Sequence, residues 1–493
     1  MAIIGKKWEI LVGDMGQGTS DTKEIVKILL RNRGIKTKAQ EREFFNPTHP
    51  NDLSPDKFGI DSKELKKAVA RVKRAKETGE KVIVWGDYDA DGICGAAVLW
   101  ESLYYSGVNA LPFVPERRLE GYGLNVPRMK RLKEDDPTIG LIITVDNGIV
   151  AHDKIDTAKE LGLDVIITDH HLPRMTQGKT GVPRVTLPQA FAILHTPKIC
   201  GAGVAWVLAR EISPINDHLG VVALATVADL VPLVGPSRSI VHHGLPVIRK
   251  TDRVGIRMLC EVAGIDQKLI TTFEFGFIIA PRLNAMGRLE HALESLRLLC
   301  TKSEKKAREL AQRLQETNAN RQELVRDTVV HAREQALASM DGGLIFISHE
   351  SYHEGIVGLV ASRLVEEFGR PAFVIYRGEE ISRGSARSIP GFNIVSLLDS
   401  ARDYLVEGGG HPMAAGFTVR TENLELLSKA FRESASGSLT DEVLTPKIKI
   451  DCEIPLLLVD LSFAKALLRF SPFGMGNPEP VFATREVFIK DVR

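Results

Sequence analysis

Residues 81–92 read KVIVWGDYDADG, an apolar run that ends in three carboxylates at alternate positions. Val82–Val84 has the β-branched composition of a short strand, and the residues after the acidic group are compatible with a helix. Because clustered carboxylates repel one another, a site that keeps Asp87, Asp89 and Asp91 ionised usually places a cation among them. The alternative is a solvated acidic turn in which Asp91 caps the next helix.

Two more apolar runs end in the same kinds of residue. Leu141–Val145 is followed by Asp146-Asn147-Gly148, and Val165–Thr168 is followed by Asp169-His170-His171. The runs alternate with helix-compatible stretches, as successive β-α-β units do, and this order predicts an α/β fold with a parallel sheet covered by helices. Ligands of an open parallel sheet bind at the carboxyl ends of its strands, so we expect these acids and imidazoles to meet in one crevice.

Asp229 is a further candidate, because it interrupts the apolar run between Leu219 and Leu233. An unpartnered carboxylate among Ala, Val and Leu side chains is costly unless a metal ion or hydrogen bonds hold it. A helix-end acid or a salt-bridged acid is the alternative for this residue.

These segments together offer an oxygen-rich set of metal ligands that includes an imidazole. The candidate metal ligands are Asp87, Asp89, Asp146, His170 and Asp229. Such a set suits Mn²⁺ or Mg²⁺ better than a thiolate-dominated zinc or copper site would, and it is larger than one octahedral ion with bound waters requires. Two ions about 3.5–4 Å apart can activate water and stabilise both oxygens of an in-line attack on phosphorus. The residues therefore predict two-metal hydrolysis of phosphodiester bonds.

The composition is that of a folded protein of several domains. The chain has 493 residues, 44% of them hydrophobic, with 64 Lys and Arg against 63 Asp and Glu. The net charge of +1 argues against a surface that binds polyanions everywhere, so a nucleic acid would need a local groove. The five cysteines form no C-x-x-C pair, which fits a cytoplasmic location. The longest apolar run, Leu219–Ala228, is shorter than the ~20 residues of a membrane span, so no membrane association is predicted.

Changes of pattern along the chain predict five segments. They are an N-terminal helical segment (1–78), an α/β domain (79–240), a helical region with a connecting helix (241–340), a smaller α/β domain (341–436) and a β-domain segment (440–493). The connecting helix is predicted over Ser303–Ser339, which has no Gly or Pro. In the smaller domain, Gly384 and Gly408–Gly410 are predicted to lie in loops. The last segment is predicted to end in a strand over Val481–Val492, and its length predicts an incomplete β-domain.

The strand-end motifs D-Y-D-A-D-G, T-V-D-N-G and T-D-H-H resemble those of the DHH phosphoesterases. Further motifs resemble the RecJ family within that superfamily. They are Gly121–Leu124, Cys200–Gly203, Ala280–Arg288, His353–Gly358, Gly384–Ser388, Gly408–His411 and Pro472–Pro478. The resemblance covers most of the chain. It implies a parallel-sheet DHH phosphoesterase domain joined by a long helix to a smaller α/β DHHA1 domain that closes over the substrate, followed by the start of an OB-like β-domain.

The family resemblance also implies an activity and its partners. It implies two-metal hydrolysis of single-stranded DNA from the 5′ end, releasing nucleotides, in DNA repair and recombination. The cofactors would be two Mn²⁺ or Mg²⁺ ions, and a single-strand-binding protein is a candidate partner.

The resemblance assigns each metal ligand a role. Asp87 and Asp89 would each bind a different ion, Asp146 would bridge both ions, and His170 with Asp229 would complete one site.

Three more residues near this centre carry expectations from the family. Asp169 would support the ligands, and His171 would reach the scissile phosphate, where an imidazolium stabilises developing charge. Some members have a His at the position of Trp85 that helps to ligate the first metal. An indole cannot do so, and water would then complete that site.

The remaining family motifs predict a substrate-binding set. It comprises Arg282, Asn284, Arg288, Ser385, Arg387, Ser388, Gly409, Gly410 and His411. The Gly384–Ser388 backbone could approach a phosphate closely, and Arg387 could bind that phosphate with two hydrogen bonds. The alternative for Gly384–Ser388 is a tight turn with an exposed Arg, and the alternative for Gly408–His411 is a flexible corner. Arg282 or Arg288 could instead form an ordinary interdomain salt bridge.

Aromatic and basic residues elsewhere offer weaker signals. Phe470, Phe473 and Phe482 are candidates for base stacking in the OB-like segment, although we favour apolar packing for each. The basic helix Lys63–Lys76 could line DNA, but we favour a solvated face.

Two other functions compete with the exonuclease. A DHH phosphodiesterase for short oligonucleotides or cyclic dinucleotides would resemble only the two α/β domains. A non-catalytic DNA-binding scaffold would have lost metal ligands, all of which are present here, so it ranks lower.

Overall fold

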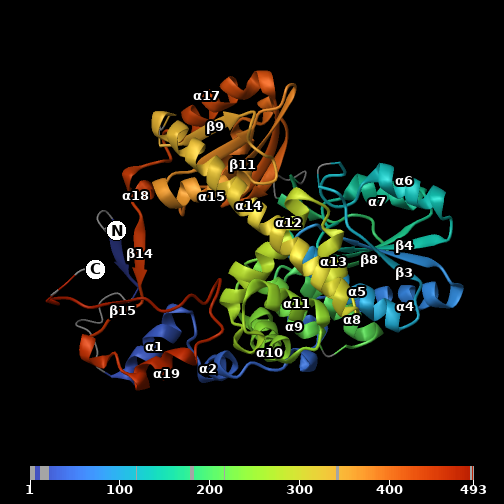
Figure 1. Ribbon diagram of the computed structural model, residues 1–493, viewed down its shortest axis with the longest axis horizontal. Coiled ribbons are helices and arrows are strands. Elements are labelled where there is room, and N and C mark those ends of the chain that lie inside the picture. Colours follow the sequence, from blue (N-terminus) through green and yellow to red (C-terminus); the bar gives the residue numbers. More distant parts are fainter. Residues whose placement is uncertain are drawn as a thin grey trace. The chain divides into compact units, whose positions relative to one another are not determined.

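The computed structural model describes residues 6–11, 21–117, 119–177, 183–215, 217–339, 343–488 and 491. The chain folds into two compact units (Figure 1). The larger unit comprises residues 14–318 and 451–493, and the smaller unit comprises residues 1–13 and 319–450. Each unit is built from separate parts of the chain, and the five segment bounds remain predictions.

The larger unit contains the predicted parallel sheet. Its strand order is β3 (Ala110–Phe113), β2 (Lys81–Gly86), β4 (Ile139–Val145), β5 (Asp164–Asp169) and β8 (Ala192–His195). All four neighbouring pairs are parallel. Gly86 pairs with Val145, and Val145 pairs with Thr168, so the carboxyl ends of three strands are level. The residues that follow these strands therefore meet at one edge of the sheet.

Side chains alternate between the two faces of this sheet, and both faces are buried. Val82 and Val84 belong to the core under α5 (Ala90–Tyr105) and α8 (Gly201–Ile212), whereas Ile83 and Trp85 belong to the core under α6 (Val126–Asp135) and α7 (His152–Glu160). Figure 1 shows α6 and α7 on one side of the sheet and α5 and α8 on the other. Burial on both faces explains why Val82–Trp85 and Leu141–Ile143 are apolar at every position.

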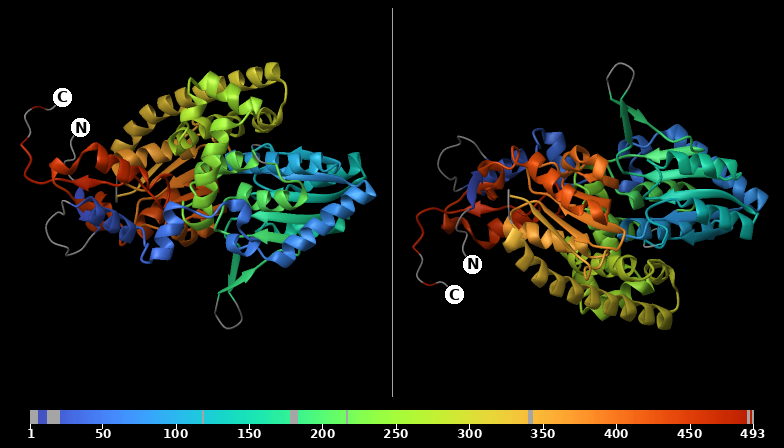
Figure 2. Two further views of the ribbon diagram at one scale, coloured as in Figure 1. Left: turned by 90° about the horizontal axis from the view of Figure 1, so that it is seen from below. Right: turned by 90° about the horizontal axis from the view of Figure 1, so that it is seen from above.

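Additional helices complete the larger unit. They are α1 (Thr22–Asn32), α2 (Lys38–Phe45), α3 (Pro55–Phe58), α4 (Ser62–Thr78), α9 (His218–Ala228), α10 (Gly235–Lys250), α11 (Val254–Ala263), α12 (Ala280–Leu289) and α13 (Leu293–Cys300). Shorter helical turns are η1 (Pro50–Asp52), η2 (Gln267–Leu269) and the π-helical η3 (Glu274–Ile279). An antiparallel pair, β6 (Arg174–Gln177) and β7 (Pro183–Thr186), projects from this unit (Figure 2). In α4, Leu65, Ala68, Val72 and Ala75 are buried.

A buried ionic network joins four helical elements of the larger unit. Arg253, at the start of α11, donates hydrogen bonds to both carboxylate oxygens of Glu101 in α5, at 2.9 and 2.8 Å. His218 Nε2 lies 2.8 Å from Glu101 Oε2, and Arg253 also donates to Leu299 O in α13. Although burial raises it, these hydrogen bonds lower the pKa of Glu101 to about 2.

We expect Glu101→Gln to lower the free energy of unfolding by about 3–5 kcal/mol, because Arg253 then loses its buried carboxylate partner and keeps only the partly exposed Asp217. The contribution of Glu101 is fully present above its ordinary pKa of 4.5 and declines as the pH falls toward about 2. Urea unfolding between neutral and acidic pH measures both effects. The exposed Glu160→Gln is the control, and equal stability of the two variants would contradict the expectation.

The smaller unit contains a second α/β sheet. Its strand order is β12 (Leu405–His411), β13 (Ala414–Arg420), β11 (Ile381–Arg387), β10 (Ala372–Tyr376) and β9 (Ile345–His349). Only β9 and β10 are parallel among these pairs. Its helices are α15 (Val357–Phe368), α16 (Ile394–Ser400), η4 (Arg402–Tyr404), η5 (Thr421–Asn423), α17 (Leu424–Ala435) and α18 (Asp441–Leu444).

The two glycine-rich segments of this unit are strands, so the predicted loops are wrong. Gly384 lies in β11, and Gly408–Gly410 lies in β12. A Cβ at Gly384 would lie 2.2 Å from the Phe417 ring, which shows that this glycine makes room for an aromatic side chain on the neighbouring strand. Glycine is required here by close packing and not by a turn.

The helix α14 (Glu304–Ser339) agrees with the predicted connecting helix and carries the chain from the larger unit into the smaller one. Within the described residues, no helix is both long enough and apolar enough to cross a bilayer.

The two ends of the chain contribute short strands. In the smaller unit, β1 (Lys7–Ile10) pairs in parallel with β14 (Lys447–Ile450). In the larger unit, β15 (Cys452–Glu453) pairs with β16 (Phe482–Ala483), and η6 (Leu456–Leu458) and α19 (Leu461–Leu468) lie between them in sequence. The predicted strand over Val481–Val492 is wrong for residues 481, 484–488 and 491, which are not in a strand, and its positions 489, 490 and 492 lie outside the described residues.

Phe470 packs within the larger unit and does not present its ring to solvent. It is fully buried against Phe44 and Phe45, with ring centroids 5.6 and 5.3 Å away. Arg238 fixes the backbone beside it by donating to the carbonyl oxygens of Phe470, Ser471 and Pro472. Phe482 packs against Phe463, so apolar packing accounts for both residues.

Candidate metal centre

The level strand ends bring four of the predicted ligands together. Asp87 follows β2, Asp146 follows β4 and His170 follows β5, while Asp229 follows α9. His170 Nε2 lies 3.2 Å from Asp146 Oδ1 and 3.4 Å from Asp229 Oδ2. Residues that are far apart in the sequence therefore form one cluster.

Three overlapping groups of side chains have the geometry to hold a cation. In each group, one ligand atom per residue lies within 4.8 Å of the others. The groups are Asp87 with Asp89 and Asp146, Asp91 with His170 and Asp229, and Asp146 with His170 and His171. Asp146 and His170 are each common to two groups, so the three groups form one connected cluster.

Several atoms of this cluster are buried and have no hydrogen-bond partner. They are Asp87 Oδ1, Asp146 Oδ1 and His170 Nε2. Such atoms cost free energy unless something satisfies them, so their convergence fits divalent cations between them. The donor set of carboxylates with imidazole is also the set that Mn²⁺ and Mg²⁺ accept.

The pKa shifts of these carboxyl groups also favour a bound cation. Burial, and then repulsion by neighbouring carboxylates, raises the pKa of Asp87, Asp89 and Asp146 above their ordinary values. Burial and the charges of Asp91 and Asp89 raise the pKa of Asp229 to about 9. A bound cation would reverse these shifts and keep the carboxylates ionised.

Asp91 does not cap the helix that follows it, so that alternative is wrong. Asp89 is the N-cap of α5 and accepts hydrogen bonds from Asp91 N and Gly92 N. Asp91 instead accepts hydrogen bonds from Gly201 N at 2.7 Å and Ala202 N at 2.8 Å, at the start of α8. The third carboxylate of the motif therefore fixes a second helix against the acidic loop.

Asp169 and His171 form a charged pair beside the ligands. His171 Nδ1 lies 2.8 Å from Asp169 Oδ1 and 3.7 Å from Asp146 Oδ1. Although burial opposes it, the hydrogen bond to Asp169 raises the pKa of His171. Burial likewise opposes a low pKa for Asp169, but hydrogen bonds from His171 and from Ile149 N lower it. The pair therefore favours an imidazolium next to a carboxylate.

Tyr122 is a site residue that sequence reasoning did not single out. Its hydroxyl donates to Asp146 O at 2.9 Å and lies 3.4 Å from His171 Nδ1. Asp146 has φ of 64°, a left-handed conformation that needs support in a residue other than glycine. Tyr122 supplies part of that support. Its place in the Gly121–Leu124 motif was the available signal.

Trp85 supports the backbone next to Tyr122 from inside the protein. Its indole is fully buried, packs on Phe113 and donates from Nε1 to Gly123 O at 3.1 Å. The side chain belongs to the core between the sheet and α6. Trp85 thus anchors the turn that carries Tyr122.

We expect Tyr122→Phe to lower kcat for phosphodiester hydrolysis about 10–100-fold, because Asp146 and His171 lose a positioning hydrogen bond. Its fold should be unchanged, since the ring remains. Steady-state kinetics with Mn²⁺, together with calorimetric titration of Mn²⁺, measures the effect. The matched control is Tyr104→Phe on the exposed side of α5, and wild-type kinetics in Tyr122→Phe would contradict the assignment.

Helix α12 holds the acidic loop in place. Asn284 Oδ1 accepts a hydrogen bond from Ala90 N at 2.6 Å, and a Cβ at Gly287 would lie 2.3 Å from Tyr88 O. The Arg282 guanidinium donates to Gln315 Oε1 and Ile278 O. Two of the residues predicted to bind substrate, Arg282 and Asn284, thus make contacts within the larger unit. Arg288 lies close enough to Tyr88 to act on it electrostatically.

In the smaller unit, the predicted substrate-binding segments lie on three neighbouring strands. Ser385 of β11 pairs with Gly416 of β13, which also pairs with Gly409 of β12. Two rows further along the sheet, Arg387 pairs with Ala414, which also pairs with His411. Segments separated in the sequence therefore form one continuous surface, which also includes Gly410.

The start of α15 lies against this surface. A Cβ at Gly358 would lie 2.9 Å from Arg387 Nη2 and 3.3 Å from Ser385 Oγ, so glycine leaves room for both side chains. Ser388 differs from them, because its buried hydroxyl donates to Phe392 O at 2.6 Å and shapes the strand end.

Models of three protein families match the chain in the order expected. The DHH family N-terminal domain matches residues 81–226, the DHHA1 domain matches residues 341–437 and the RecJ OB domain matches residues 450–493. The expected fold class, a DHH domain followed by a smaller α/β DHHA1 domain and an OB-like segment, is confirmed.

Named relatives identify the family within the DHH class to which the chain is similar. The chain is 36% identical to the single-stranded-DNA-specific exonuclease RecJ of Bacillus subtilis over 508 residues, covering 99% of the chain and 62% of that protein. It is 36% identical to RecJ of Thermus thermophilus, covering 87% and 63%. It is 32% identical to RecJ of Haemophilus influenzae, covering 92% and 82%. The chain belongs to the RecJ family.

Solved structures agree with this membership. The crystal structure of RecJ from Thermus thermophilus in complex with Mn²⁺ matches with a TM-score of 0.78 and 29% identity, covering 97% of this chain and 70% of that one. A structure of exonuclease RecJ bound to manganese matches with a TM-score of 0.66 and 33% identity, covering 79% and 98%. The chain spans 62% and 63% of the length of its Bacillus and Thermus relatives.

Proposed function

We propose that the protein hydrolyses phosphodiester bonds of single-stranded DNA from the 5′ end with two divalent metal ions and releases nucleotides. The observation that carries the proposal is the convergence of buried, unpartnered carboxylate and imidazole atoms at one sheet edge. The names of the RecJ relatives and the Mn²⁺-bound and Mg²⁺-bound RecJ structures support the substrate and the cofactors.

In this proposal, Asp87 and Asp89 would each hold a different ion, Asp146 would hold both, and His170 and Asp229 would complete one site. Bound ions supply Lewis-acid activation of the attacking water and neutralise charge on the phosphate. Asp146 and His170 each belong to two of the three ligand groups. Asp146 is the one suited to the bridge, because a carboxylate offers two oxygens whereas a neutral imidazole offers one nitrogen.

His171 acts on the phosphate as a cation. Its proton is held at Nδ1 by Asp169, which leaves Nε2–H to donate to a phosphate oxygen as negative charge develops there. Asp169 is a positioning residue, since its carboxylate also accepts from His170 N and Ile149 N and is thereby fixed. The Tyr122 hydroxyl lies 3.4 Å from the same ring nitrogen, Nδ1, and so helps to orient the imidazole.

The smaller unit binds the substrate phosphates in this proposal. Ser385 and Arg387 offer a hydroxyl and a guanidinium, and Gly409 and Gly410 allow a phosphate to approach the backbone beside His411. Arg288 of α12 contacts the DNA backbone. Arg282, Asn284 and Ser388 contribute by positioning the elements on which these groups lie.

The cellular setting is part of the same proposal. Five free cysteines are consistent with the reducing cytoplasm, where single strands arise during repair and recombination. A single-strand-binding protein is the candidate partner that would present such strands.

Product analysis on end-labelled strands tests the proposed function. With Mn²⁺, the wild-type protein should release nucleotides from the 5′ end of a 5′-phosphorylated single strand and leave the matching duplex intact. Faster hydrolysis of a dinucleotide than of a long strand would favour a short-oligonucleotide phosphodiesterase. Absence of Mn²⁺ uptake in calorimetry would favour the non-catalytic scaffold.

A further inference from the structure

A basic groove lies in the larger unit and is lined by none of the metal-cluster residues. Two cavities of about 730 and 600 Å³ share Pro246, Lys250, Thr251 and Asp252, so they form one continuous groove. We call it the α10–α11 groove. Its exposed or partly exposed basic side chains are Arg249, Lys250, Arg257, Lys268 and Lys302.

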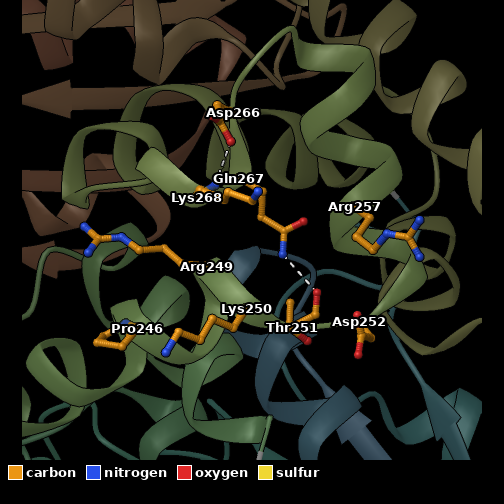
Figure 3. Close-up of a pocket in the computed structure, with 9 residues that line it drawn as sticks. All are labelled: Pro246, Arg249, Lys250, Thr251, Asp252, Arg257, Asp266, Gln267 and Lys268. Atoms are coloured by element: carbon orange, nitrogen blue, oxygen red, sulfur yellow. Dashed lines mark hydrogen bonds between the residues drawn. The ribbon is translucent and has the colours of Figure 1, made fainter.

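Hydrogen bonds from one side chain to two backbone carbonyls fix the shape of the groove. Gln267 of η2 crosses it and donates from Nε2 to Ile248 O at 3.0 Å and Thr251 O at 2.9 Å. Figure 3 shows Gln267 at the centre, with Arg249 and Arg257 on opposite sides. The groove is therefore a built feature and not a gap between loose side chains.

Positive charge is in excess along the groove. Six basic side chains line the two cavities against three acidic ones, whereas the whole chain has a net charge of only +1. One of the acids, Asp217, is paired with the buried Arg253. Among the described residues, the five groove cations named above make no ion pair within 4 Å, while the nearby Arg308 pairs with Glu261. An anionic occupant would supply the missing partners.

An exposed aromatic pair borders the Arg249 end of the groove. Phe273 and Phe277 stack with ring centroids 4.9 Å apart and an interplanar angle of 27°, and they are 57% and 72% exposed. Arg249 donates from Nε to Ile270 O at 2.7 Å, three residues before Phe273. Surfaces that bind single-stranded nucleic acid combine a basic groove, which follows the backbone, with exposed aromatic rings, on which the bases stack.

We propose that the α10–α11 groove and the Phe273–Phe277 pair bind a single strand of nucleic acid outside the metal centre. The cations contact its phosphates, and the rings stack on its bases. The identity of that strand as the DNA substrate rests on the proposed function, whereas binding of a single strand does not. The site would add affinity for long strands without taking part in hydrolysis.

Charge reversal tests the phosphate contacts. Fluorescence anisotropy in EDTA, which prevents metal-dependent hydrolysis, follows binding of a labelled oligothymidylate of about 30 nucleotides. We expect the double variant Lys250→Glu/Lys268→Glu to bind about tenfold more weakly near 100 mM salt. The slope of log affinity against log salt concentration should fall by about 1.4, because each lost phosphate contact removes about 0.7.

A matched double variant controls for net charge. Lys130→Glu on α6 and Lys159→Glu on α7 change the charge of the same unit equally at exposed lysines outside the groove. This control should bind and hydrolyse DNA as the wild type does. Equal affinities and salt slopes of the groove variant and the control would overturn the proposal. It would also be overturned if the groove substitutions weakened binding of a polyglutamate peptide but left binding of DNA unchanged.

Truncation of the rings tests the stacking contacts. We expect Phe273→Ala/Phe277→Ala to weaken binding of oligothymidylate at least tenfold and to leave binding of an abasic strand of equal length unchanged. Equal weakening on both strands would overturn the stacking assignment. Wild-type hydrolysis in Mn²⁺ is measured in parallel. A wild type that binds the strand but does not degrade it would refute the proposed function and leave this site standing.

Discussion

Asp146→Asn should reduce Mn²⁺-dependent hydrolysis of 5′-phosphorylated single strands by roughly 10³-fold or more, because the group that we propose to bridge both ions loses its charge. The amide is nearly the same size, and asparagine tolerates the left-handed φ of 64° at this position, so the fold should remain intact. End-labelled product analysis measures the activity, and circular dichroism measures the fold.

Metal binding gives this prediction an independent readout. Calorimetry should show loss of at least one of two Mn²⁺ sites in Asp146→Asn. The matched control is Asp156→Asn, an exposed carboxyl on α7 of the same unit, which should retain wild-type activity and metal uptake. Full activity of Asp146→Asn would remove the bridging assignment.

Gly201→Ala should lower activity by at least about 100-fold and destabilise the protein by about 1–3 kcal/mol. Gly201 is the first residue of α8, and an added Cβ would lie 2.6 Å from both Cβ and Oδ1 of Asp146. The methyl group must displace either the helix or the carboxylate. Displacement of the helix would also disturb the hydrogen bond from Gly201 N to Asp91 Oδ2.

A second glycine separates this effect from the general cost of changing a glycine. Gly276→Ala would meet nothing nearer than Val227 Cγ1 at 3.8 Å, so it should change neither stability nor activity appreciably. Kinetics and urea unfolding of the two variants make the comparison. Indistinguishable behaviour of Gly201→Ala and Gly276→Ala would show that close approach at Asp146 does not constrain the centre.

The sheet and the position of the cluster could be predicted from the sequence because both follow from short-range patterns. An apolar run such as Leu141–Val145 followed by Asp146 identifies a buried strand and a polar group at its carboxyl end. Parallel topology then dictates that such groups from several strands share one edge. The same reasoning located His170 and His171 after β5.

Contacts between distant segments could not be predicted in this way. Three alternating carboxylates look alike in sequence, and only the position of α8 decides that Asp91 receives its amides while Asp89 caps α5. Tyr122 reaches Asp146 because Trp85 anchors the intervening turn from the core. These assignments depend on tertiary packing.

Glycine was the main source of error in the smaller unit. Gly384 and Gly408–Gly410 are typical of loops by composition, yet they lie in β11 and β12. At Gly384, the reason is that the Phe417 ring packs over the strand where a side chain would stand. This steric requirement comes from a residue on another strand, so the sequence around the glycine does not indicate it.

The pairing of Lys7–Ile10 with Lys447–Ile450 has a consequence for biosynthesis. Lys7 and Lys447 are 440 positions apart, so β14 is translated long after β1. Until then, β1 presents unpaired amides and carbonyls, and closure of so long a loop is slow. Nascent chains stalled before residue 447 should therefore be captured by chaperones through this N-terminal strand.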